Sequence, residues 1–204
     1  MRHLQSSHPE DLPTADALGL LVRAHEGAPG WPALLTPSQQ QRHLAPLLRA
    51  VLMSANHAVA AWQGQQLLGL LLADYPSPTA RRCPSPSLRQ LIRCLVLPRP
   101  LQRLLRDPIY ARQADCHGYV LAVCVAPEWQ RRGIGRDLIR TLTGAIPAMP
   151  WLAHTDHAGS RRLFVSSGFE PCEQSEQQGL IIDRLTRQTR PVRKKADANA
   201  SALS

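Results

Sequence analysis

Residues 123–136 combine residue types that could together hold a diphosphate group. An apolar run is followed by a loop and by two glycines, Gly133 and Gly135, at the expected start of a helix. The first amides of a helix have no intrahelical partner, and the helix dipole adds partial positive charge at that end. Glycine lets the backbone approach a ligand closely. Because Arg131, Arg132 and Arg136 add formal charge, the stretch predicts a diphosphate cradle.

The spacing of the glycines excludes the GxGxxG dinucleotide fingerprint, since Leu138 stands where its last glycine should be. Residues 130–135, Gln-Arg-Arg-Gly-Ile-Gly, instead resemble motif A of the GCN5-related N-acetyltransferases, Q/R-x-x-G-x-G/A. Residues 161–169, which end in Leu-Phe-Val-Ser-Ser-Gly-Phe, resemble motif B of that family, usually L-Y-x-x-x-G-F. The resemblance covers about Leu67 to Leu185.

The resemblance implies that acetyl-CoA is the cosubstrate and that an amine attacks its thioester directly. In the family, the strand before the loop binds the pantetheine arm through its backbone, which maps to Val123 and Val125, and the loop amides hold the pyrophosphate. The residues implied to contact acetyl-CoA are Val123, Cys124, Val125, Gln130, Arg131, Arg132, Gly133, Ile134, Gly135, Arg136, His157 and Phe164.

The sequence departs from the family pattern where a proton is delivered to the leaving thiolate. Phe164 occupies the place of the usual tyrosine and has no proton to give. His157 stands where the family has asparagine, and Ser160 where it commonly has alanine. The acid is therefore water, or Ser167 one turn on, or absent.

The base that takes a proton from the ammonium is equally open, because residues 119–125 contain no carboxylate. The catalytic residues are therefore unknown, with Ser167, Tyr119 and Glu26 as the candidates. Further candidates for the base or for acceptor contacts are Asp74, Tyr75, His117 and His154, and Trp31 could line the acceptor site. Each of these is more typical of a structural or surface role when taken singly.

Cysteine usage indicates a reducing, cytoplasmic compartment, because the five cysteines are odd in number and form no CxxC. Cys124 invites a covalent acyl-enzyme, but a cysteine in a buried strand is usually there for packing. Cys116, His117, His154 and His157 fit no closed zinc pattern, so we expect no metal.

The hydrophobic pattern predicts the elements that must position this stretch. Strands are expected over 2–5, 58–62, 66–73, 118–125, 151–155, 169–172 and 180–185. Helices are expected over 15–24, from Thr36 towards Leu52, over 136–145 and over 158–167, the last ended by Gly168. Further helical spacing falls within the basic segment 76–117.

The chain has 204 residues, 44% of them hydrophobic, and a net charge of +9. No apolar run approaches the roughly 20 residues of a membrane span, and no basic flank marks a signal peptide. The positive charge is concentrated in residues 76–117 and 184–195, each with a net +6. These segments could dock RNA or ribosomes, but a solvated basic face is the simpler reading.

We therefore expect an α/β fold with a twisted, mostly antiparallel sheet that splays at a central parallel pair and is flanked by helices. Residues 1–186 would form one acetyltransferase-like domain with the basic helical insert 76–117, and residues 187–204 a basic, disordered tail. The expected function is N-acetyl transfer from acetyl-CoA to a primary amine of a small molecule or protein. Alternatives are a non-catalytic acyl-CoA-binding module and an RNA-docking protein of the same fold. No membrane partner is expected, nucleic acid is not the favoured partner, and the protein is a monomer or homodimer.

Overall fold

The computed structural model describes residues 2–25, 52, 55–75, 118–155, 157–177 and 180–187. Within them the chain forms a seven-stranded sheet in the order β1-β2-β3-β4-β5-β7-β6. The strands are β1 (Arg2–Ser7), β2 (His57–Gln63), β3 (Gln66–Asp74), β4 (Gly118–Val125), β5 (Trp151–Thr155), β6 (Glu170–Gln177) and β7 (Leu180–Arg187). The described helices are α1 (Thr14–His25), α5 (Ile134–Ala145) and α6 (Ala158–Ser166), with 3-10 turns η1 (Pro9–Asp11) and η2 (Pro127–Trp129).

The sheet is antiparallel except where β4 and β5 run parallel at its centre. The predicted mixed sheet with a central parallel pair is confirmed. The two strands β2 and β3 are joined by a two-residue turn and are buried along almost their whole length. Strands covered on both faces read as near-continuous apolar runs, which is why the hairpin was recognisable in the sequence.

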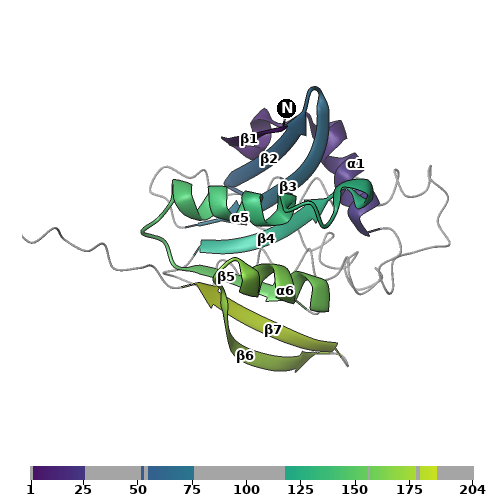
Figure 1. Ribbon diagram of the computed structural model, residues 1–204. Helices are drawn as coiled ribbons and strands as arrows, with labels where there is room; N and C mark the ends of the chain where they lie inside the picture. The colour runs from purple at the N-terminus through teal and green to yellow at the C-terminus, as the bar shows by residue number, and fades with distance from the viewer. Residues whose placement is uncertain are drawn as a thin grey trace, which may run out of the picture.

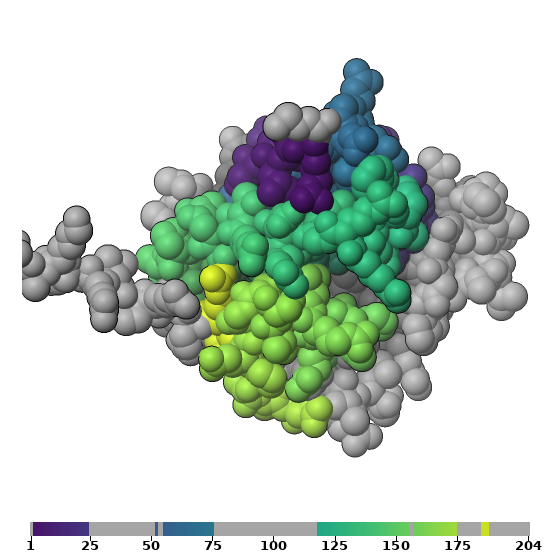
Figure 2. Space-filling view, viewed as in Figure 1, coloured from purple at the N-terminus to yellow at the C-terminus, as the bar shows by residue number. Residues whose placement is uncertain are grey.

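Helices cover both faces of the sheet, so the molecule has three layers (Figure 1). Helix α1 packs Ala17, Leu20 and Leu21 against one face, where they join a core that includes Leu70 and Leu72. Helices α5 and α6 pack on the other face, where Leu138, Ile139, Leu142 and Phe164 are buried. The two helices lie side by side on the face seen in Figure 2.

Most predicted elements agree closely with the observed ones, but β6 (Glu170–Gln177) ends five residues beyond the expected strand over 169–172. Helix α5 begins at Ile134, two residues before the expected start, so the glycine loop runs directly into it. Helix α6 ends at Ser166, and Gly168 has φ +88°, a left-handed conformation that favours glycine after a helix. The expected helix from Thr36 towards Leu52 and the basic segment 76–117 lie outside the described residues, Leu52 excepted. None of the described helices has the length and apolar character that a membrane span requires.

Candidate functional site

The central feature of the site is the separation of β4 from β5. The parallel pairing covers only Gly118 to Val120 on β4, and its last pair is Val120 with Ala153. On its other side β4 stays paired with β3 as far as Val125. Backbone groups of a strand point alternately to the two sides, so part of the backbone from 121 to 125 faces the β5 side, where the described pairing has ended. An extended ligand could add to β4 there as a strand would.

The part of β4 beyond its pairing with β5 runs directly into the predicted diphosphate loop. The Ala126 amide donates to the Leu68 carbonyl at 2.9 Å, which ties the start of the loop to β3. The Gln130 side chain donates through Nε2 to the Val125 carbonyl at 3.2 Å, which closes the turn through η2. Gln130 of motif A thus stabilises the conformation of the loop through a hydrogen bond to its own backbone.

The backbone conformation of the loop depends on Arg131 and Gly133. Arg131 has φ +60° and Gly133 has φ +81°, both in the left-handed region. Gly133 is the N-cap of α5 and has no side chain to cap the helix. The first intrahelical bond runs from the Asp137 amide to the Gly133 carbonyl at 3.0 Å, so the helix itself leaves the preceding amides unbonded. Such amides suit an anion, and the local backbone therefore fits a diphosphate.

Gly135 has a different role from Gly133. A Cβ at position 135 would lie 3.0 Å from Cδ2 of Leu163, whereas at position 133 nothing lies within 4 Å. Gly135 therefore permits close packing of α5 on α6, and Gly133 supplies the unusual φ. The sequence had suggested close approach to a ligand for both glycines.

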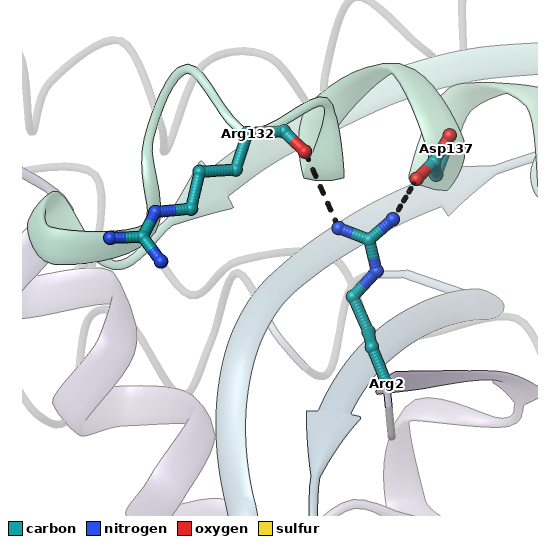
Figure 3. A network of polar contacts seen from close by, with 3 residues as sticks. All are labelled: Arg2, Arg132 and Asp137. Atoms are coloured by element: carbon teal, nitrogen blue, oxygen red, sulfur yellow. Dashed lines mark hydrogen bonds and ion pairs between the residues drawn. The ribbon is translucent and has the colours of Figure 1, made fainter.

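Charged groups surround the loop. Arg131, Arg132 and Arg136 are exposed, and the Arg132 guanidinium lies 4.7 Å above the Trp129 ring. Asp137 is an acidic residue in the first turn of α5. Arg2, from the start of β1, contacts both the Arg132 carbonyl and the Asp137 carboxylate (Figure 3). Sequence reasoning missed Arg2 and Asp137, because neither belongs to motif A or B.

The residues of motif B lie on α6, next to α5. His157 is the N-cap of α6, with an exposed side chain, and its amide donates to Oγ1 of Thr155 at 3.2 Å. Phe164 is buried, and its ring meets Phe169 edge to face with centroids 5.1 Å apart. The Ser167 hydroxyl donates to the Leu163 carbonyl at 2.8 Å, so its proton is engaged by its own helix.

Tyr119 and His154 meet across β4 and β5, next to the point where the strands separate. The Tyr119 hydroxyl and Nδ1 of His154 are 2.8 Å apart, and the rings pack edge to face. Tyr119 is buried, on the α1 face of the sheet, and His154 is partly exposed. The sequence named both residues but gave no sign of this pairing.

Cys124 is not suited to act as a nucleophile. Its side chain is buried in the α1-face core, and burial raises the pKa of its thiol to about 12. A thiol with such a pKa stays protonated at neutral pH, and the thiolate is the nucleophile. Cys124 can serve a ligand through its backbone alone.

Of the remaining candidate residues from the sequence, some lie within the described residues and others lie outside them. Asn56 exchanges two hydrogen bonds with the Tyr75 backbone, so Tyr75 is held at the end of β3, beyond Asp74. Glu26, Trp31, Cys116 and His117 lie outside the described residues. Among the residues that are described, no three His, Cys, Asp or Glu side chains are grouped to bind a metal ion.

Known structures share this fold over nearly the whole chain. A histone acetyltransferase HPA2 and related acetyltransferase from Corynebacterium glutamicum is 14% identical, with TM-score 0.61, and the match covers 93% of this chain and 97% of that one. An N-acetyltransferase from Staphylococcus aureus is 15% identical, with TM-score 0.58 and coverage of 90% and 99%. The ribosomal-protein-S18-alanine N-acetyltransferase of Escherichia coli is 14% identical, with TM-score 0.56 and coverage of 93% and 94%. At such identities the likeness shows the fold.

The family assignment comes from the sequence itself. No curated protein matches the chain. The profile of the Acetyltransferase (GNAT) family, however, matches residues 31–169, which is well over half of the chain and contains both the loop before α5 and the second motif. The chain therefore belongs to the GNAT family of acetyltransferases, and its activity is the transfer of an acetyl group from acetyl-CoA to an amine.

Proposed function

We propose that acetyl-CoA binds along the separated part of β4 and the loop before α5, and that the acetyl group passes directly to a primary amine. The single observation that carries the proposal is the continuity of these two parts. Beyond its last pair with β5, Val120 with Ala153, β4 runs on to Val125, and the loop that follows ends at the start of α5, where Gly133 has no side-chain cap. When bound, acetyl-CoA supplies the acetyl thioester.

The residues proposed to hold acetyl-CoA divide by the part of the ligand that they would meet. The backbone of Val123, Cys124 and Val125 would meet the pantetheine arm, as an added strand would. The amides of residues 131–136, including Ile134, would meet the diphosphate, with Arg131, Arg132 and Arg136 adding charge. His157 is the N-cap of α6 and Phe164 lies on this helix, which packs beside α5.

Direct transfer is supported by the state of the cysteine on β4. A covalent acyl-enzyme would need a thiolate, and Cys124 is buried with its thiol pKa raised to about 12. The amine must instead lose its proton to a nearby group. Among the described residues we favour Tyr119 and His154 for this task, because their 2.8 Å contact lies next to the point where β4 and β5 separate. With Nδ1 of His154 bonded to the Tyr119 hydroxyl, Nε2 is the ring nitrogen that would take the proton.

The acceptor is a small-molecule or protein amine. The protein would act in the cytoplasm, which the odd number of cysteines and the lack of a CxxC motif support.

The test compares two arginines of one helix. Arg136 and Arg140 are both exposed on α5, but only Arg136 lies in its first turn. Arg136→Glu should weaken acetyl-CoA binding in titration calorimetry about tenfold or more, whereas Arg140→Glu should leave it within about twofold. Equal effects of the two substitutions would contradict a diphosphate at the start of α5.

A stability measurement tests the site as a whole. Acetyl-CoA at about 100 times its Kd should stabilise the fold by roughly 2.7 kcal/mol, which raises Tm by about 5–11 °C. A panel of amines with thiol release as the readout would then identify the acceptor class. No rise in Tm at millimolar acetyl-CoA would refute the proposed binding site.

A further inference from the structure

We propose that Arg2 is a positioning residue for the diphosphate-binding loop, acting on the ligand through the peptide between Arg132 and Gly133. The inference rests on the proposed acetyl-CoA site. Arg2 lies on β1, 130 positions before Arg132 in the chain, and belongs to neither sequence motif.

The contacts of Arg2 join β1 to two points of the loop (Figure 3). Nη1 donates to the Arg132 carbonyl at 3.4 Å, and Nη2 donates to Oδ2 of Asp137 at 2.5 Å. The guanidinium thus lies between the end of the loop and the first turn of α5. The Arg132 side chain extends away from Arg2, towards Trp129.

The first consequence is the orientation of one amide. In a trans peptide the carbonyl and the following N–H lie in one plane and point in opposite directions. Because Arg2 holds the Arg132 carbonyl, the Gly133 N–H must point away from Arg2. Glycine adopts positive and negative φ with similar ease, so the peptide before Gly133 could otherwise rotate. Arg2 therefore favours the rotation in which this amide is presented on the opposite side of the loop.

The second consequence concerns charge. Asp137 is favourably placed for the dipole of α5, but a carboxylate in this turn repels a diphosphate bound at the same end. The ion pair with Arg2 offsets that repulsion without occupying the amides. Arginine suits this position because its two terminal nitrogens can bond two different acceptors, whereas lysine has a single ammonium.

The experiment compares two ligands that differ in the diphosphate. Titration calorimetry would give the Kd of acetyl-CoA and of S-acetylpantetheine, which has the same thioester arm but no diphosphate. The variants are Arg2→Gln and Arg2→Lys, with Arg23→Gln as a control that removes one exposed charge from α1. A C-terminal tag keeps the residues around Arg2 unaltered.

We expect Arg2→Gln to raise the Kd of acetyl-CoA roughly three- to tenfold, the range typical of one lost hydrogen bond, and to leave the Kd of S-acetylpantetheine unchanged. Arg2→Lys should give a smaller increase, and Arg23→Gln none. An unchanged acetyl-CoA Kd in Arg2→Gln, or an equal rise for both ligands, would overturn the inference. If Arg2→Gln fails to fold, the same two outcomes in Arg2→Lys decide.

This test is separable from that of the proposed site. If wild-type protein binds acetyl-CoA no better than S-acetylpantetheine, the diphosphate site itself is wrong, and the role of Arg2 falls with it. If wild-type protein discriminates between the ligands and both Arg2 variants discriminate equally well, only the role of Arg2 is wrong.

Discussion

Replacing Gly133 by alanine isolates the backbone conformation of the loop from every other property of the site. The added methyl group would have no atom within 4 Å, so it creates no clash. The residue, however, has φ +81°, where a side chain is strained. Any effect of Gly133→Ala therefore arises from the backbone.

The cost of this strain should be about 1–2 kcal/mol, the usual penalty for a left-handed residue with a Cβ. If the loop keeps its conformation, the cost appears as a loss of stability, and Tm falls by about 2–8 °C. If the loop of the free protein relaxes to another conformation, the strain energy must be supplied when acetyl-CoA binds. The Kd of acetyl-CoA then rises about 5- to 30-fold. The two losses together should amount to the same 1–2 kcal/mol.

Denaturant unfolding and titration calorimetry on one preparation measure both losses. Gly144→Ala is the matched control, since Gly144 lies in the same helix, has no positive φ and has open space around its Cα. This substitution should stabilise the protein by about 0.5–1 kcal/mol and leave the Kd of acetyl-CoA unchanged.

The reasoning is refuted if Gly133→Ala matches wild type in both stability and acetyl-CoA affinity. Such a result would mean that the left-handed conformation at position 133 is not required in the free or the bound protein. A change in Gly144→Ala affinity equal to that in Gly133→Ala would show instead that any added methyl on α5 disturbs binding.

Three further predictions concern the chemistry of transfer. Phe164→Tyr should raise kcat in a thiol-release assay, because the tyrosine hydroxyl supplies an acid for the leaving thiolate. It should also lower Tm, because this hydroxyl enters the apolar contact with Phe169. An unchanged kcat would contradict the role of the hydroxyl as the acid. His154→Ala should lower kcat about 100-fold or more at unchanged acetyl-CoA Kd, and Tyr119→Phe should lower it less; full activity in His154→Ala excludes it as the base. Burial raises the pKa of the Cys124 thiol in the folded protein to about 12, whereas the unfolded chain has the ordinary value of 9.0. As pH rises from 9.0 towards 12, the thiol therefore ionises in the unfolded chain but not in the folded protein, and the free energy of unfolding should fall. Cys124→Ala should retain transfer activity and lack this alkaline loss, and an identical pH profile in the variant would show that the thiol is not buried.

Much of the fold could be predicted because its signals are local. Apolar alternation and helical spacing depend on neighbouring residues, so most strand and helix ranges agreed closely with those observed, whereas the polar second half of β6 was missed. The two motifs also placed the loop and α6 in the right order, and the parallel pairing of β4 with β5 followed from the family resemblance.

What the sequence by itself determined is therefore the elements, the family and the loop whose glycine has a positive φ. Only the tertiary structure decided which distant residues meet there. Arg2 reaches Asp137 across 135 positions, and Tyr119 reaches His154 across 35. Gly135 proved to be a packing position because Leu163, on another helix, lies against it. Such contacts depend on strand order, register and the packing of all layers at once, and no local pattern encodes them.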